Sequence, residues 1–238
     1  MNSKKTKFIC FEGMDGSGKS TLSKFLSEEY QLMGKSVKYL RWLDGEDTFL
    51  KKTIRFFGKV SKSDTNNKQM KISNFHPIIE GHKNHNKNRL LVHIYVTFIL
   101  INYLWYGLSQ VGIARFLNKY DIFIIDRYYF DVIFSICKEF GYSQSTTESI
   151  ILWYKKILPD PDLFIFILIN PSLALERKPD EFLSIEQAII TEQWHNELFS
   201  LIEYHTKTLQ VKFDNSKNIN LAQKELISIV TLVLGEKT

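Results

Sequence analysis

A chain of 238 residues, 44% hydrophobic and 24% charged, is long enough for one large globular domain and too apolar for general disorder. Its net charge of +5 suits anionic substrates, although a lysine-rich source proteome would give the same balance. The two cysteines, Cys10 and Cys137, lie far apart, so we expect neither a disulfide scaffold nor a zinc site. A reducing, cytoplasmic environment fits this cysteine usage.

Short apolar runs alternate with helical stretches along the chain, which is the pattern of parallel βαβ units. A first strand over residues 8–11 leads into a glycine-rich loop and a helix over about 19–32, which Gly34 ends. A second strand over 36–40 ends at Arg41. The first apolar run is too short for the core of a signal peptide.

Residues 59–88 are rich in Asn, Lys, Ser and His. This composition predicts a flexible basic and polar insertion, which is most simply a mobile surface loop. The alternative is a basic segment that closes over an anionic ligand. The histidines alternate with Asn and Lys without a carboxylate, so a metal site is not expected there.

The stretch 90–114 contains no charged residue and is long enough to cross a bilayer. Polar side chains interrupt it, namely His93, Asn102, Ser109 and Gln110. Because polar groups are costly in lipid, we expect a central helix over about 89–119 that is buried on most sides, and no membrane partner.

A continuously apolar strand over 120–125 follows and ends in Asp126 and Arg127, as strands buried on both faces do in parallel sheets. The rest of the chain alternates in the same way: a helical region to about 158, a strand over 163–169, helical sequence over 173–209, a strand over 211–213 and a helix over 221–234. No repeat or linker divides the sequence. We therefore predict a single α/β domain over 1–238, a three-layer sandwich with a five-stranded parallel sheet flanked by helices.

Residues 13–20, GMDGSGKS, match the phosphate-binding pattern G-x-x-x-x-G-K-[ST] at every fixed position. The pattern stands where its mechanism requires, after an apolar strand and at the start of a helix. Its glycines let backbone N–H groups converge on phosphate oxygens, and the helix N-terminus adds positive field. Lys19 would reach the β- and γ-phosphates of ATP, and Ser20 would offer its hydroxyl to Mg²⁺. The residues expected at the nucleotide are Gly13, Asp15, Gly16, Ser17, Gly18, Lys19, Ser20 and Thr21.

Asp126 ends a buried strand, so it should emerge at the same carboxyl edge of the sheet as the phosphate-binding loop. A carboxylate there can hold Mg²⁺ directly or through water. Arg127 beside it can bind a phosphate with two N–H groups. An ion pair between these two neighbours is the simpler alternative.

Several stretches, in chain order, resemble the thymidylate kinase family of P-loop nucleoside monophosphate kinases. FEGMDGSGKST at 11–21 is similar to the family's FEGxDGxGKST signature, and DRY at 126–128 to its DRY motif. PDL at 161–163, followed by ALER at 174–177, resembles the stretch that begins its lid. FDNS at 213–216 is similar to the segment before its last helix. The DRYYxD continuation and the basic lid resemble an uncharacterised thymidylate-kinase-like branch more closely.

The resemblance implies ATP-dependent phosphoryl transfer to a nucleoside monophosphate, with dTMP to dTDP as the leading reaction and ATP and Mg²⁺ as cofactors. Asp15 aligns with the carboxylate that contacts the acceptor sugar hydroxyl, and Arg127 with the arginine that holds the acceptor phosphate. The resemblance places Arg41 as a second phosphate-binding arginine and Asn215 beside the nucleotide. Family members often dimerise through long apolar helices, which leaves a homodimer open here.

The resemblance also implies a lid over residues 174–200. Some family members carry a catalytic arginine inside the P-loop, where this chain has Gly16. The charge that stabilises the transferring oxygens would then come from Arg177 or Lys178 of the lid. The alternative for Arg177 is a solvated helix residue.

The helix arginine with which the family reads thymine is missing from this chain. The equivalent stretch offers Asn102, Tyr103 and Tyr106, whose aromatic rings could stack a base or simply fill the core, and Asp131 stands where the family has Ser. Two alternatives therefore stay open: a kinase for another small phosphorylated acceptor, and a nucleotide-binding P-loop protein without turnover. No nucleic-acid partner is expected.

Overall fold

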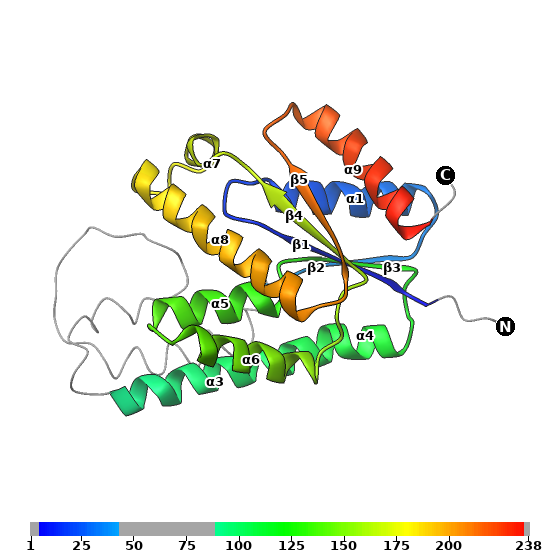
Figure 1. Ribbon diagram of the computed structural model, residues 1–238. Helices are drawn as coiled ribbons and strands as arrows, with labels where there is room; N and C mark the ends of the chain where they lie inside the picture. Colours follow the sequence, from blue (N-terminus) through cyan, green and yellow to red (C-terminus); the bar gives the residue numbers. More distant parts are fainter. Residues whose placement is uncertain (1–4, 43–88, 236–238) are drawn as a thin grey trace.

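The computed structural model describes residues 5–42 and 89–235 (Figure 1). Its centre is a parallel sheet of five strands in the order β2-β3-β1-β4-β5. The strands are β1 (Lys7–Glu12), β2 (Val37–Arg41), β3 (Ile122–Asp126), β4 (Leu163–Leu168) and β5 (Leu209–Asp214). The insertion expected at 59–88 lies outside the described residues.

Helices cover both faces of the sheet, so the fold has three layers (Figure 1). One face packs on α1 (Lys19–Leu32) and α9 (Ile219–Leu234). The other face carries the longer row of helices, namely α3 (Arg89–Gly107), α5 (Tyr129–Glu139), α6 (Gln144–Lys155) and α8 (Ile185–His205). The predicted α/β sandwich with a five-stranded parallel sheet is confirmed.

The alternation of side chains along β1 explains why both faces of the sheet are buried. Phe8 and Cys10 join the cluster formed with α5 and α8, whereas Ile9 and Phe11 join the cluster formed with α1 and α9. Strand β3 is buried at every residue. Continuous apolar sequence is thus the consequence of a strand that has a helical layer on each side.

The helix predicted over 173–209 is two helices, α7 (Pro171–Arg177) and α8. The chain leaves the helical conformation at Lys178, where φ is −140° and ψ is 63°. Pro179 follows, and the residue before a proline avoids the helical region because the proline ring clashes with it. The lid predicted at 174–200 thus consists of the end of α7, a turn and most of α8, and its movement stays a prediction.

The helix predicted over 89–119 is α3, one π turn η3 (Leu108–Gly112) and a last turn α4 (Ile113–Phe116). One side of it enters the core, where Val96 and Val111 are at most 1% exposed. The opposite side is open, with Trp105 at 72% and Phe116 at 84% exposed. The expectation of burial on most sides is therefore wrong, because among the described residues no further layer covers this helix.

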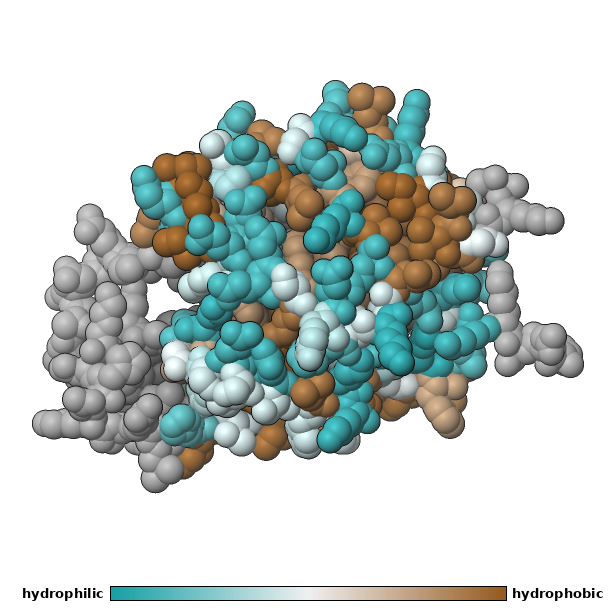
Figure 2. Space-filling model, in the orientation of Figure 1, coloured by the Kyte–Doolittle hydropathy of each residue, from teal (hydrophilic) through white to brown (hydrophobic). Residues whose placement is uncertain are grey.

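By length and composition, the segment His93–Phe116 could cross a membrane: it spans 24 residues, and an 18-residue stretch within it has a mean hydropathy of 1.3 and is 28% buried. A single helix of this kind is weak support for a membrane span, since core helices of soluble proteins have the same composition. Elsewhere the surface is mixed. Figure 2 shows an apolar area over the end of α9, where Leu232 is 82% exposed.

A partly buried ion pair links α4 to the amino ends of the central strands. Arg115 donates to both carboxylate oxygens of Asp162, at 2.7 and 2.8 Å, and to the carbonyl oxygen of Thr6 at 2.6 Å. The backbone N–H of Phe8 donates to the same carboxylate at 2.8 Å. Burial alone would raise the pKa of Asp162, but the bonds from Arg115 and Phe8 lower it.

We predict that Asp162→Asn destabilises the protein by about 1–3 kcal/mol at pH 7, because it leaves Arg115 without its charged partner. Because the pKa of Asp162 is lowered in the folded state, its contribution is present above the unfolded value of about 3.9 and is lost as the pH falls through the folded value. Urea unfolding at pH 7 and pH 3 measures both effects. Asp180→Asn, at an exposed position, is the control. Equal stability of the two variants at pH 7 would show that the ion pair between Arg115 and Asp162 does not stabilise the fold.

Candidate functional site

The phosphate-binding loop runs from the end of β1 to the start of α1. Gly16 and Gly18 have φ of 78° and 86°, a left-handed region that favours glycine. A Cβ atom on Gly16 would lie 2.7 Å from the carbonyl oxygen of Ala174 in α7, and one on Gly18 would clash with the side-chain amide of Asn215. The close packing of these neighbours leaves no room for an arginine at position 16.

Lys19, the first residue of α1, is only 5% exposed. Its Nζ donates to the carbonyl oxygen of Met14 and pairs with Oδ1 of Asp15, both at 3.2 Å. Burial and the nearby guanidinium of Arg127 lower the pKa of Lys19, while Asp15 opposes the shift. The ammonium group is therefore held inside the loop by a single carboxylate and a carbonyl.

Asn215, which follows β5, is buried and holds the loop from the other side. Its Nδ2 donates to the carbonyl oxygen of Ser17 at 2.7 Å. Oδ1 of Asn215 and the hydroxyl of Ser17 are both buried and have no hydrogen-bond partner in the part of the chain that the structure describes. Two polar atoms beside the loop thus remain for a ligand to bond.

The register of the sheet brings the ends of β1, β2 and β3 together. Asp126 pairs with Phe11 on one side and with Arg41 on the other. Asp126 is fully buried, and within the described residues neither of its carboxylate oxygens has a hydrogen bond; Nε of Arg41 lies 3.8 Å from Oδ2. The predicted convergence of this carboxylate with the phosphate-binding loop at one edge is present.

Glu12, the last residue of β1, is fully buried at the same edge. Its Oε1 accepts from the backbone N–H of Tyr128 at 2.9 Å. Burial, with Asp131 nearby, raises the pKa of Glu12 well above its usual range, which favours the neutral form. Glu12 therefore adds a hydrogen-bonding group to this edge and little negative charge.

Arg127 joins the loop to α5. Its φ of 67° is left-handed, and its backbone N–H donates to the carbonyl oxygen of Phe11 at 2.9 Å. One side-chain nitrogen donates to Asp131 at 2.6 Å and the other to Asp15. Burial opposes the charge, yet Asp131 and Asp15 raise the pKa of Arg127, so it stays cationic.

The two cations of the predicted lid lie in different places. Arg177, the last residue of α7, donates to the carbonyl oxygen of Asn215 at 3.1 Å, and its Nη1 lies 3.9 Å from the position of a Cβ on Gly18. Lys178 is half exposed, and its Nζ lies 3.8 Å from Glu181. The structure thus brings Arg177 to the rim of the loop and leaves Lys178 on the turn that follows.

The remaining predicted nucleotide residues lie at the start of α1. Ser20 is partly buried in its first turn, and the side chain of Thr21 is exposed. Among the described residues, no three side chains of the His, Cys, Asp and Glu types gather to hold a metal ion. Mg²⁺ is commonly bound through one or two protein groups together with substrate phosphates, a mode for which Ser20 and Asp126 are suitable.

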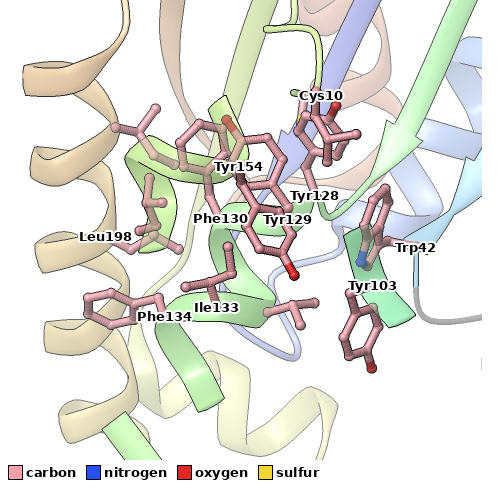
Figure 3. Packing of buried hydrophobic residues seen from close by; sticks show 14 of the residues in the cluster. Cys10, Trp42, Tyr103, Tyr128, Tyr129, Phe130, Ile133, Phe134, Tyr154 and Leu198 are labelled. Carbon is pink, nitrogen blue, oxygen red and sulfur yellow. The ribbon is translucent and has the colours of Figure 1, made fainter. Parts of the chain in front are cut away.

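Two of the three residues predicted to recognise a base, Tyr103 and Tyr106, pack on Trp42, which directly follows β2. Tyr103 is buried and stacks on Trp42 with ring centres 6.5 Å apart, and Tyr106 meets the same ring edge-on at 5.3 Å (Figure 3 shows Trp42 and Tyr103). Asn102 donates to the carbonyl oxygen of Phe98 within its own helix at 2.8 Å. The rings belong to the core cluster, and a role in binding a base stays a prediction.

Three groups at this edge had no assigned role in the sequence. Glu12 lies within the FEG motif, and Asp131 follows Arg127 at the four-residue spacing of a helical ion pair, so the sequence pattern could have indicated both residues. No sequence pattern indicates His195. Its ring lies 3.6 Å from Asp131 because α8 packs against α5, and nothing in the local sequence indicates that contact.

No protein-family model matches the chain, and no curated protein matches it. Among solved structures, the thymidylate kinase from Ehrlichia chaffeensis is similar, with a TM-score of 0.55 and 15% sequence identity. The similarity covers 94% of this chain and 98% of that one. It shows that the chain has the fold of a P-loop kinase such as thymidylate kinase over nearly its whole length.

The different positions of the two lid cations generate a prediction. Arg177→Ala should lower kcat for phosphoryl transfer by about tenfold or more, because it removes a cation next to the loop. Lys178→Ala should change kcat little, which makes it the matched control. Steady-state ADP release at saturating substrates measures both. A larger loss in the Lys178 variant would show that the lid rearranges and that Lys178 carries the charge.

Proposed function

We propose that the protein transfers the γ-phosphoryl group of ATP to a nucleoside monophosphate, with dTMP to dTDP as the leading reaction. The supporting observation is the convergence of three groups at one edge of the sheet: the loop with buried Lys19, the buried carboxylate of Asp126, which accepts no hydrogen bond from the described residues, and charged Arg127. Buried polar atoms without partners cost free energy, and a nucleotide with its metal ion would supply partners to them.

The residues of the loop fit the triphosphate of ATP. The positive φ values of Gly13, Gly16 and Gly18 suit a loop whose backbone N–H groups converge on phosphate oxygens, and the start of α1 adds its positive end. The hydroxyl of Ser17 within the loop and the amide oxygen of Asn215 beside it have no hydrogen-bond partner among the residues that the structure describes. Lys19 would exchange Asp15 for the β- and γ-phosphates, a stronger charged partner.

Ser20 and Asp126 would hold Mg²⁺, which would neutralise part of the negative charge of the phosphates. The protein's own contribution is to position the two substrates and to stabilise charge, because phosphoryl transfer needs little covalent catalysis by the protein. Arg177 would add positive charge where the γ-phosphoryl group leaves. Arg127 would hold the acceptor phosphate in line with it, with Arg41 as a second cation at the same edge.

Asp15 is suited to orienting the acceptor sugar. Burial alone would raise the pKa of Asp15, but Arg127 and Lys19 lower it well below the usual range. A carboxylate of this kind is a weak base and a good hydrogen-bond acceptor. Its proposed role is therefore to accept the hydrogen of a sugar hydroxyl, and not to take up a proton during the transfer.

A kinase for another small phosphorylated acceptor is the second candidate. Two observations favour it over strict thymine recognition: Asn102 is bonded within its own helix, and the ring of Tyr103 is stacked on Trp42. A nucleotide-binding protein without turnover is the third. The position of Arg177 beside the loop argues against this third candidate, because a protein that only binds nucleotide does not need a cation near the γ-phosphate.

We predict ATP-dependent ADP release with at least one monophosphate among dTMP, dUMP, dCMP and dGMP, and its loss in Lys19→Ala. That variant removes the cation proposed for the β- and γ-phosphates, and a retained melting temperature checks that it still folds. Turnover that survives in Lys19→Ala would contradict the role of the loop. Nucleotide binding without turnover on any acceptor would leave the third candidate.

A further inference from the structure

Asp131 lies on the first turn of α5, and its two carboxylate oxygens face different groups. Oδ2 accepts from Arg127 at 2.6 Å, whereas Oδ1 lies 3.6 Å from Nε2 of His195. Asp131 is 3% exposed, and the side chain of His195 is 14% exposed. The pair connects the arginine of the proposed acceptor site with α8, the second helix of the predicted lid.

The hydrogen bonds of His195 determine which of its nitrogens carries the proton. Nδ1 lies 2.9 Å from the carbonyl oxygen of Thr191, and a carbonyl can only accept, so Nδ1 bears the hydrogen. Burial lowers the pKa of His195, with Arg127 and Lys19 acting in the same sense and Asp131 and the Thr191 carbonyl opposing them. The lowered pKa favours the neutral ring, in which Nε2 is a hydrogen-bond acceptor.

Two hydrogen-bond acceptors, Oδ1 of Asp131 and Nε2 of His195, thus lie 3.6 Å apart between largely buried side chains. Nε2 of His195 has no hydrogen-bond partner within the described ranges. Leaving a buried acceptor unsatisfied is costly, so the arrangement is suited to a group that gives one hydrogen to each side. A lone hydroxyl carries one hydrogen and can satisfy only one of the two. A bridging water, a primary amino group or two neighbouring hydroxyls can satisfy both, and the last two can belong to a substrate.

We propose that Asp131 and His195 recognise a paired hydrogen-bond donor on the acceptor substrate: an amino group with two hydrogens, or two neighbouring sugar hydroxyls. The inference rests on the proposed function, because that function places Arg127, the partner of Asp131, at the acceptor. The two residues set specificity and do not touch the transferred group. Thymine has no amino group and a deoxyribose has no neighbouring hydroxyl pair, so dTMP would bind without this contact, and the inference favours the second candidate, a kinase for another small phosphorylated acceptor.

Four acceptors separate the two sources of the paired donor. dUMP carries neither, dCMP carries the amino group, UMP carries the hydroxyl pair, and CMP carries both. Comparing kcat/KM with the same Mg·ATP, we expect at least one of dCMP and UMP to exceed dUMP by about tenfold or more. An advantage of dCMP assigns the amino group, and an advantage of UMP assigns the hydroxyls. Equal values for all four overturn the proposal.

His195→Phe removes the acceptor nitrogen while keeping a ring of similar size, and it should abolish the preference found in the native protein. His195→Gln supplies an acceptor oxygen and should restore part of it. His205→Phe, at the end of the same helix, is the matched control and should keep the native preference. A preference that survives intact in His195→Phe overturns the role of the histidine.

Nuclear magnetic resonance of the imidazole nitrogens provides a readout that does not depend on turnover. At pH 7 we expect His195 to be neutral with its hydrogen on Nδ1, and its Nε2 resonance to shift on addition of CMP and not of dUMP. A doubly protonated ring would overturn the proposal, because an ion pair with Asp131 leaves no acceptor to satisfy. If no monophosphate reacts at all, the proposed function fails, and this titration still decides the inference.

Discussion

The buried charge of Arg127 is the constraint on which the site depends. A guanidinium shut away from water needs carboxylate partners, and it takes one from the phosphate-binding loop, Asp15, and one from α5, Asp131. Removing one partner of a buried pair typically costs about 3–5 kcal/mol, a range that applies to the pair with Asp131 and not to the pair with Asp15, whose side chain is 46% exposed. The loop and the helix are therefore held in one relative position by a residue whose own backbone has a left-handed φ of 67°.

That position is produced by the register of the sheet rather than by the loop itself. Because β1 and β3 are parallel and Phe11 pairs with Asp126, the chain leaves both strands at the same level, and Arg127 bonds back to Phe11. The last strand adds the third support through Asn215, which bonds the loop at Ser17. The glycine positions follow from this crowding, because α7 and Asn215 occupy the places that side chains at Gly16 and Gly18 would need.

The features that could be predicted depend on short stretches of sequence. The P-loop, the buried strands and the meeting of Asp126 with the loop follow from spacing and from apolar runs, and the structure contains all three. The features that could not be predicted depend on packing between distant elements. The open side of α3 is one, since apolar composition does not say how many layers cover a helix. The approach of His195 to Asp131 is another, because it arises only when α8 lies across α5.

The charges at the edge of the sheet also suggest how the two substrates of the proposed reaction would influence each other. Lys19 and Arg127 share one oxygen, Oδ1 of Asp15. In the proposed reaction, ATP phosphates draw Lys19 away and the acceptor phosphate draws Arg127 away. Each event weakens the hold on Asp15, whose carboxylate then becomes free to accept a sugar hydroxyl. Because one carboxylate is released by both ligands, the binding of either should favour the binding of the other, a coupling built into three side chains without any large movement of the fold.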